Sequence, residues 1–403
     1  MRDTMEHTRP YIRIGTSYYK TVRKPLASGD AMVMLIPWSA ECIKQDHGKS
    51  YLSEIEKYDG FCFVPSHLNY QRIVENFYNR YYPFKHKAKE GDPVNSLNYL
   101  RHIFGEQLEF GLDYLKLLLE RPMQRLPILC LVSTDRNTGK TTFLNWLKAI
   151  FGDNMTINTN EDFRSNFNAE WTQKLLIGVD ETFLERREDS ERLKNLSTAT
   201  FYKTEAKGMD RQETEFFGKF ILCSNNEDNF LIIDPGETRY WIRKIPVLMS
   251  DNPHLLAKLR EEIPMLVHYL TKRKMTTNNQ TRMWFSPEQI FTPALKKVIR
   301  QNRVKLEVEL AGVLLSIVDD QELKEISFCI GDAQGWLNRR GIRSPDTPSI
   351  RRILQNVWNL KPASNSNAYM QYKFSTEGNI YEQASKGRFY TLDMETILKL
   401  NDS

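Results

Sequence analysis

The chain has 403 residues, of which 40% are hydrophobic and 27% are charged, and its formal net charge is +5. A single hydrophobic core rarely grows to this length, so we expect two or three domains. No apolar run reaches the roughly 18 residues of a membrane-spanning helix, and the N-terminus lacks the apolar stretch of a secretory signal. The composition therefore predicts a cytoplasmic protein with no membrane partner. Its five cysteines lack the spacing of a zinc site or a disulfide framework and are expected to be reduced.

The first third of the chain divides into two parts. Residues 1–75 alternate β-rich pieces with a helical stretch and form an N-terminal region of unknown role. Residues 76–125 are expected to form a helical domain. Its pattern begins in the aromatic-rich stretch "YQRIVENFYNRYYPF" from Tyr70 and resumes after a loop until Pro122.

From Leu126 the pattern changes to short apolar runs that alternate with helices. Such alternation predicts an α/β domain, over residues 126–250, whose sheet is covered on both faces. In "LPILCLVSTDRNTGKTTFLNWLKAIFG" an apolar strand precedes Gly-Lys-Thr and a helix follows it, as a phosphate-binding loop requires. We expect that helix to end at Gly152.

The phosphate-binding pattern G-x-x-x-x-G-K-[ST] is incomplete here, because Thr134 stands where the first glycine is expected. The phosphate ligands lie at the other end of the motif. Lys140 bridges the β and γ oxygens and the Thr141 hydroxyl binds Mg²⁺, so the loop is predicted to bind ATP and Mg²⁺. A chance Gly-Lys-Thr triplet is the alternative. The predicted nucleotide-binding residues are Asn137, Thr138, Gly139, Lys140, Thr141 and Thr142.

Acidic residues follow the next buried strand, in "KLLIGVDET". In phosphate-loop enzymes such a strand delivers an aspartate to Mg²⁺, which is the role we expect for Asp180. The adjacent Glu181 is expected to orient or deprotonate the attacking water. A surface turn opened by an acidic pair is the alternative reading.

Two further signals follow downstream. The apolar strand in "FGKFILCSNN" ends at Asn225, which is predicted to hold the water and the γ-phosphate, although asparagine also forms ordinary turns. Arg239 lies between a turn and a strand, from which it could reach a neighbour's ATP and neutralise transition-state charge. An ordinary salt bridge is the alternative for Arg239.

A hairpin is predicted between the acidic pair and Asn225, in "FYKTEAKGMDRQETEFFGKF". Lys203 and Lys207, the latter beside Gly208 at the tip, would contact a nucleic-acid backbone. A solvent-exposed hairpin with solubilising lysines is the alternative.

The remainder of the chain is predicted to be a linker and a last domain. Residues 251–305 are expected to form a basic helical linker, whose charges meet phosphates or simply face solvent. Residues 306–403 are expected to form a winged-helix-like α+β domain with three helices and then a hairpin of "AYMQYKFS" with "GRFYTLD". Arg351 and Arg352 on the third helix would lie along a DNA groove. A plain packing module is the alternative.

The ordered set of strand, Gly-Lys-Thr, helix, "VDE", lysine-bearing hairpin, "SNN" and arginine resembles the superfamily 3 helicases. It is most similar to the phage and plasmid primase-helicases, which are related to the poxvirus primase-helicase. The resemblance covers Asn79 to Val247, and a C-terminal winged helix suits the same family.

The resemblance implies an AAA+-type P-loop ATPase that forms a ring, usually a hexamer, and moves along single-stranded or forked DNA during replication of a phage, plasmid or mobile element. Its host would be bacterial. Lys140 and Thr141 would be the Walker A residues, with Asp180 and Glu181 as the Walker B pair. Asn225 would be the sensor and Arg239 the arginine finger supplied in trans.

Two departures from the family pattern shape the competing hypotheses. The first glycine of the loop is missing, which favours an origin-binding or scaffold protein that uses nucleotide only for assembly. The region of about a hundred residues before the ATPase is too short for a typical primase, so we expect a separate primase and polymerase. A P-loop kinase of a small metabolite is the third hypothesis.

Overall fold

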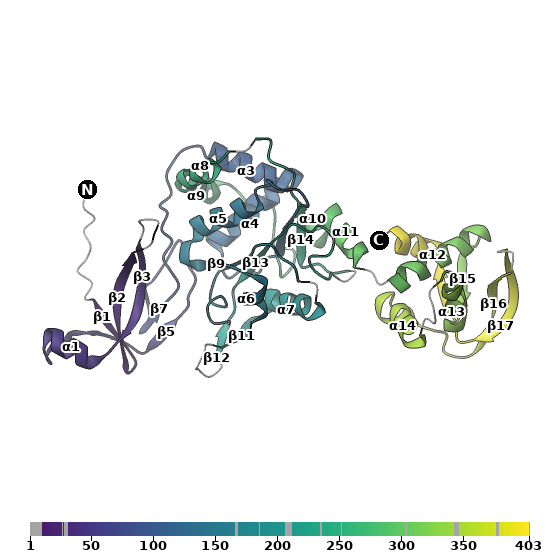
Figure 1. Cartoon of the computed structure of the whole chain (residues 1–403), viewed down its shortest axis with the longest axis horizontal. Helices are drawn as coiled ribbons and strands as arrows, with labels where there is room; N and C mark the ends of the chain where they lie inside the picture. The colour runs from purple at the N-terminus through teal and green to yellow at the C-terminus, as the bar shows by residue number, and fades with distance from the viewer. Residues whose placement is uncertain are drawn as a thin grey trace.

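The protein is described here from a computed structural model, and its three parts follow one another along the molecule in chain order (Figure 1). The described residues are 10–25, 27, 31–165, 168–184, 186–205, 212–233, 236–250, 252–302, 305–341, 346–375 and 379–402.

The N-terminal part is β-rich, as expected. One sheet has the order β3-β2-β1-β4 and a smaller one the order β5-β7-β6. The strands are β1 (Tyr11–Ile14), β2 (Ser17–Pro25), β3 (Ala31–Trp38), β4 (Glu56–Tyr58), β5 (Gly60–Cys62), β6 (Ile73–Val74) and β7 (Phe77–Asn79). The helices α1 (Ala40–His47) and α2 (Tyr51–Glu54) stand between β3 and β4.

The helix predicted from Tyr70 is wrong, because β6 and β7 form a short antiparallel pair in this stretch. Glu75 has a φ of 54°, which reverses the chain between them. The buried Asn79 side chain donates to the carbonyl oxygens of Val64 and Gln71, which holds the returning strand. The apolar residues spaced three and four apart in this stretch therefore belong to a hairpin and not to a helix.

The central part is a mixed α/β domain built on a parallel sheet with the order β14-β8-β13-β10-β9. The strands are β8 (Ile128–Val132), β9 (Met155–Asn158), β10 (Leu176–Val179), β13 (Lys219–Ser224) and β14 (Tyr240–Lys244). Every residue of β8 is buried: Leu129 and Leu131 join one core cluster, whereas Ile128, Cys130 and Val132 join the other. The predicted sheet covered on both faces is thus confirmed.

Helices cover the sheet and lead into the hairpin. Those before and within the domain are α3 (Val94–Phe104), α4 (Leu108–Glu120), α5 (Lys140–Phe151), α6 (Asn160–Arg164) and α7 (Arg187–Thr198), with a short 3-10 turn at Gly105–Gln107. Helix α5 ends before Gly152, as predicted, where φ is 56°. The predicted hairpin is formed by β11 (Phe201–Thr204) and β12 (Gln212–Glu215).

The segment expected to be a linker instead packs on the central part. Its helices are α8 (Leu255–Glu261), α9 (Ile263–Lys272), α10 (Pro287–Ile290) and α11 (Pro293–Gln301). Leu259, Ile263 and Leu266 are buried in the same core as α3, α4 and α5. The Glu262 carboxylate also accepts hydrogen bonds from the backbone N–H groups of Asn95 and Ser96 at the start of α3. The apolar faces of α8 and α9 are thus buried in the core, although the segment is rich in basic residues.

The C-terminal part contains the predicted three helices followed by a hairpin. Its elements are α12 (Lys305–Asp320), β15 (Glu325–Phe328), α13 (Ile330–Arg339), α14 (Thr347–Arg352), a π turn (Ile353–Val357), β16 (Asn367–Phe374), β17 (Ile380–Gly387), β18 (Tyr390–Asp393) and α15 (Met394–Asp402). The predicted hairpin partner is wrong, because β16 pairs with β17. Strand β18 pairs with β15, since Tyr390 and Leu392 are buried in register with Phe328 and Ile326.

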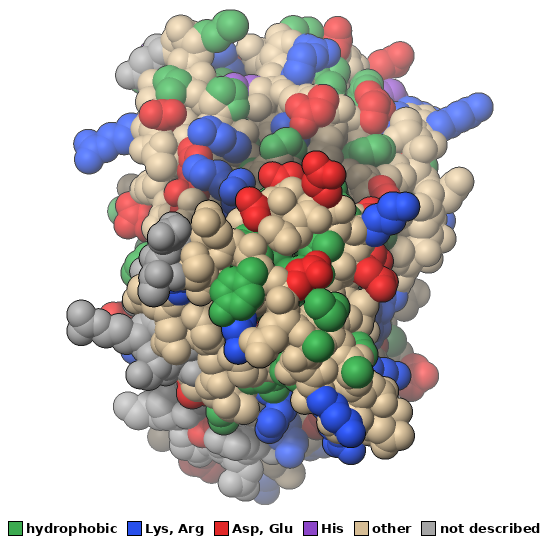
Figure 2. All heavy atoms as spheres, turned by 90° about the vertical axis from the view of Figure 1, so that its right-hand side faces the viewer, with side chains coloured by type: hydrophobic (Ala, Val, Ile, Leu, Met, Phe, Trp, Pro, Cys, Tyr) green, Lys and Arg blue, Asp and Glu red, His purple; other side chains and the backbone are tan. Residues whose placement is uncertain are grey.

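The exposed surface of this part carries charges of both signs, as the view onto it shows (Figure 2). On the face that this view shows, charge alone therefore does not mark a DNA-binding surface. Among the helices that the structure describes, none has the length and apolar character needed to span a bilayer.

The buried Lys219 in the central core predicts how the stability of the protein depends on pH. Its side chain is 4% exposed, and its ammonium donates to the carbonyl oxygens of Pro122 and Phe217. Burial lowers the pKa of Lys219 to about 7 from an ordinary value of 10.5. Between these values the unfolded chain binds more protons than the native one, so Lys219 makes stability increase with pH.

We predict that Lys219→Met removes this increase. The free energy of unfolding of the wild type, relative to the variant, should rise from about pH 7 toward pH 10 by up to about 1.4 kcal/mol per pH unit. Chemical denaturation across that range at constant ionic strength measures it. Lys258→Met, at an exposed lysine of α8, is the control. Parallel pH curves for wild type and Lys219→Met would contradict the prediction.

Candidate phosphate-binding site

Three adjacent strands deliver most of the predicted site residues to one edge of the sheet. Strands β8, β13 and β10 are neighbours and run parallel, so their carboxyl ends meet at the same edge. The loop from Ser133 to Gly139 follows β8, Asp180 follows β10 and Asn225 follows β13. The sheet thus brings the predicted loop, acid and amide together.

The loop between β8 and α5 has the backbone of a phosphate cradle. Asn137 and Gly139 have φ values of 55° and 88°, which turn the chain into the first residue of α5, Lys140. The N–H groups of the first helical turn have no partner within the helix and favour an anion. A Cβ atom at Gly139 would lie 3.2 Å from the Tyr99 hydroxyl oxygen, so both conformation and space require glycine.

The Lys140 side chain lies inside this loop. It is 6% exposed, and its Nζ donates to the Ser133 carbonyl oxygen at 3.2 Å and to Thr138 Oγ1 at 3.0 Å. Burial lowers the pKa of Lys140, and the nearby charges of Asp180 and Glu227 partly oppose that shift. The Lys140 ammonium is thus held inside the loop by two hydrogen bonds.

The residues beside Lys140 differ in exposure. Thr138 is buried, Thr141 is exposed at the start of α5 and Thr142 is half-buried. Thr141 is therefore exposed in the first turn of α5, whereas the Thr138 hydroxyl accepts from Lys140 Nζ within the loop.

The acidic pair occupies the turn after β10. Asp180 is half-buried, whereas Glu181 is exposed and has a φ of 51°, which is unusual for a residue with a side chain. The Glu181 N–H donates to Asp180 Oδ1 at 3.1 Å. Asn225, which is also exposed, follows the neighbouring strand β13.

Arg239 is not brought together with Lys140. It immediately precedes β14, and its carbonyl oxygen accepts from the Ile128 N–H at the start of β8. Arg239 therefore lies at the sheet edge opposite the loop. Its Nη1 donates to both Glu237 carboxylate oxygens, at 2.8 and 2.7 Å. In this structure the side chain forms the ordinary ion pair that the sequence left open.

Three residues that contact the loop have no motif in the sequence. From α3, the Tyr99 hydroxyl donates to the Gly139 carbonyl oxygen at 2.7 Å, and His102 Nε2 lies 3.0 Å from the Thr138 carbonyl oxygen. Their spacing of three residues puts them on one helix face, but nothing in the sequence says what that face meets. The third is Glu227, whose carboxylate accepts from the Thr134 N–H.

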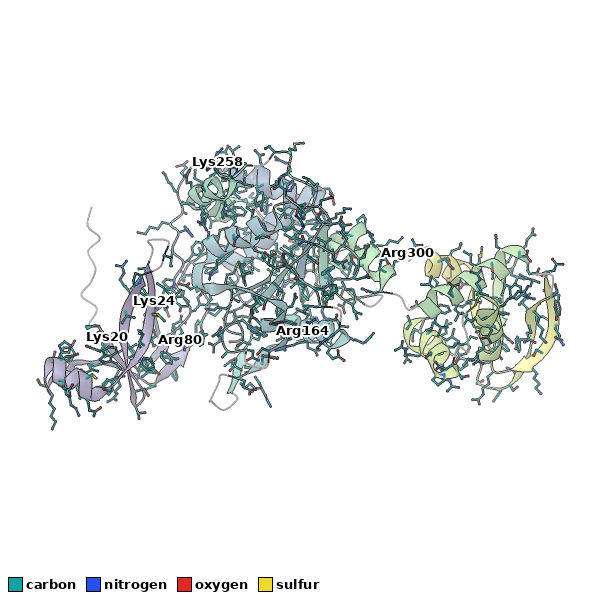
Figure 3. The ribbon with its side chains drawn as sticks, in the orientation of Figure 1. Lys20, Lys24, Arg80, Arg164, Lys258 and Arg300 are labelled. Carbon is teal, nitrogen blue, oxygen red and sulfur yellow. The ribbon has the colours of Figure 1, made fainter. Side chains whose placement is uncertain are left out.

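The predicted DNA-contacting residues lie in two separate parts. Lys203 is exposed on β11, and Arg351 and Arg352 are exposed on α14. Lys207 and Gly208 lie outside the described residues. Other basic side chains are spread over the chain, with Lys24 and Arg80 in the N-terminal part and Arg300 on α11 (Figure 3). Among the described residues, Lys203 thus lies in the central part, whereas Arg351 and Arg352 lie in the C-terminal part.

The donor set fits Mg²⁺ held between protein and phosphates. Within the described ranges, no group of three or more His, Cys, Asp and Glu side chains is placed to hold a metal. Thr141 and Asp180 offer two oxygen ligands at the loop edge. Mg²⁺ commonly keeps several waters and uses one or two carboxylates together with substrate phosphates.

Comparisons with known proteins support the fold. A family model described as a family of unknown function (DUF5906) matches residues 131–240. The search of curated proteins found no significant match. The structure is similar to two apo structures of the NrS-1 C-terminal region, each at 14% identity. The TM-scores are 0.65 and 0.62; the first match covers 94% of this chain and 95% of that one, and the second covers 95% of each.

These matches show a shared fold across nearly the whole length of both chains. A further match, to a small-molecule complex of JCV helicase, has 11% identity, covers 57% of this chain and 65% of that one, and has a TM-score of 0.32. At that score no conclusion for this chain is drawn from it.

We predict that Tyr99→Phe destabilises the protein by about 1 kcal/mol, because the Gly139 carbonyl oxygen loses its donor. Tyr240→Phe is the matched control: the Tyr240 hydroxyl is also buried, yet it has no hydrogen-bond partner among the described residues. Its removal should cost nothing. Thermal or chemical unfolding measures both, and equal effects of the two substitutions would refute the assignment.

Proposed function

We propose that this protein is an ATP-dependent, ring-forming DNA helicase of the superfamily 3 type, acting in the replication of a phage, plasmid or mobile element. The observation that carries the proposal is the edge of the parallel sheet where the loop around the buried Lys140 meets Asp180 and Asn225. The full-length fold similarity to the NrS-1 C-terminal region is compatible with it.

Each residue at this edge has a chemical role in the proposal. The loop N–H groups and Lys140 bind the β and γ phosphates, while Thr141 and Asp180 hold Mg²⁺. Bound Mg²⁺ neutralises the charge that develops on the transferred phosphoryl group. Glu181 accepts a proton from the attacking water, and Asn225 orients that water. The role of the chain is thus to position the reactants and neutralise charge.

Arg239 completes the site of a neighbouring subunit in this proposal. The supporting observation is its place at the sheet edge opposite Lys140, where it is too far along the strands to serve its own loop. An arginine finger would leave Glu237 when the neighbour's ATP arrives and stabilise the transition state there. A closed ring, a hexamer in the proposal, supplies every site with such a neighbour.

DNA contacts are proposed at two places. Lys203 on β11, together with the Lys207 predicted from the sequence, would contact a single-stranded backbone. Arg351 and Arg352 on α14 would contact duplex DNA through the C-terminal part, whose order of helices and hairpin suits a winged helix. Priming and synthesis are assigned to a separate primase and polymerase.

The alternative is an origin-binding or scaffold protein that uses nucleotide only for assembly. Thr134 in place of glycine is the feature that favours it. ATP turnover stimulated by single-stranded DNA and displacement of a strand from a forked duplex would establish the helicase. DNA binding without either activity would establish the alternative.

We predict that Lys140→Ala abolishes ATP hydrolysis, because the ammonium that meets the phosphates is lost. Glu181→Gln should bind ATP and assemble but turn over at least about 100-fold more slowly, the usual effect of losing a general base. Thr134→Gly should be tolerated, since the glycine of the family pattern allows the close turn for which the Thr134 side-chain contact is not needed. Phosphate release measures all three, and near-normal turnover by Lys140→Ala would refute the site.

We predict that Arg239→Ala and Lys140→Ala complement each other when mixed. Each variant alone should be inactive, but a mixed ring contains interfaces at which an intact Lys140 faces an intact Arg239 of its neighbour. ATP turnover should therefore reappear in the mixture in proportion to such interfaces. Full activity of Arg239→Ala alone would show that Arg239 is only the partner of Glu237.

A further inference from the structure

Glu227 connects the start of the phosphate-binding loop to the rest of the domain. It lies in the loop after β13 and is only 4% exposed. Its Oε1 accepts from the Thr134 N–H at 3.1 Å and from the Thr134 hydroxyl at 3.4 Å. Thr134 is the residue that replaces the first glycine of the motif, so the departure from the pattern has a specific partner.

The other carboxylate oxygen faces two lysines. Glu227 Oε2 lies 3.0 Å from Lys244 Nζ at the end of β14 and 3.4 Å from Lys297 Nζ on α11. Burial by itself would raise the pKa of Glu227, but the hydrogen bonds from Lys244 and the Thr134 N–H hold it below its ordinary value. Glu227 is therefore a buried anion, and the two lysines balance the charge that would otherwise repel phosphates.

The contacts of Glu227 with the two lysines and its contacts with Thr134 contribute differently to stability. The lysine side chains are 58% and 49% exposed, and exposed ion pairs contribute little. The contacts to Thr134 end on a buried carboxylate, where a lost partner is costly. A second contact ties the same two loops together, because the Ser133 N–H donates to the Ser224 carbonyl oxygen at 3.2 Å. The point where the chain leaves β8 is thus fixed by the loop that carries Asn225.

We propose that Glu227 is a positioning residue for nucleotide binding: it holds the loop at Thr134, in place of the close turn that the missing glycine would give, and keeps the loop N–H groups aimed at the phosphates. The inference rests on the proposed binding of ATP at this loop. Glu227 contacts Thr134, and its charge also favours the protonated form of Lys140, which binds the phosphates, so its loss weakens binding and leaves the chemical step intact.

Glu227→Gln is the first variant, since it keeps the shape and removes the charge. Binding of ADP with Mg²⁺, followed by calorimetry, should weaken about tenfold, equivalent to about 1.4 kcal/mol. The KM for ATP should rise by a similar factor, with kcat within about twofold. Asp228→Asn is the matched control, because Asp228 stands in the same loop and pairs with Lys297 at 2.8 Å but does not contact Thr134. It should bind as the wild type does.

A double-mutant cycle with Thr134→Val separates positioning from a general loss of folding. Thr134 is exposed, so this variant should fold, and it removes the hydroxyl that donates to Glu227. Thr134→Val keeps the N–H contact and loses only the hydroxyl contact, so it should weaken ADP binding less than Glu227→Gln does, and the two effects should be less than additive. Unfolding without nucleotide checks that each variant is folded.

The outcomes are distinct. Equal ADP affinity in wild type and Glu227→Gln, or additive effects in the cycle, would overturn the inference and leave the proposed function standing. A fall in kcat with unchanged KM would also overturn it, because Glu227 would then act in the chemical step. A wild-type protein that binds neither ADP nor ATP with Mg²⁺ would overturn the proposed function and the inference together.

Discussion

Parallel alignment of the five strands of the central sheet is the constraint on which the rest of the structure depends. A parallel strand cannot be reached by a tight turn, so each connection passes over a face of the sheet and returns at the same edge. This is why the loop after β8, the acids after β10 and the amide after β13 converge although some ninety residues separate the first from the last. The same alignment places Arg239, which precedes β14, at the opposite edge.

The helices outside the sheet complete the loop from a different direction. Tyr99 and His102 meet the carbonyl oxygens of Gly139 and Thr138, and α3 is itself anchored at its start by Glu262 between α8 and α9. Glu227 holds the other end of the loop at Thr134. Residues of α3 therefore support the end of the loop, and Glu227, in the loop after β13, supports its start. These contacts hold the loop in shape without the first glycine.

Predictions from the sequence were correct where a residue pattern is compatible with only one local structure. The Gly-Lys-Thr pattern predicted a loop between a strand and a helix, and in that loop Asn137 and Gly139 have positive φ values. The stretch from Tyr70 failed because its apolar residues fit a helix face and a hairpin equally well, and a turn at Glu75 decided between them. The strand in "GRFYTLD" was foreseen, but its partner was not, since pairing depends on which buried strand lies alongside.

The sequence by itself determined the strand, loop and helix around Lys140, the acids and amide at the ends of later strands, and the three helices before the C-terminal hairpin, because these follow from local periodicity and backbone preference. Only the tertiary structure decided that α8 and α9 pack beside α3, that Tyr99 and His102 contact the loop, and that the buried Glu227 carboxylate accepts a hydrogen bond from the Thr134 N–H. These contacts join residues far apart in the chain, and no local pattern encodes which buried surfaces meet.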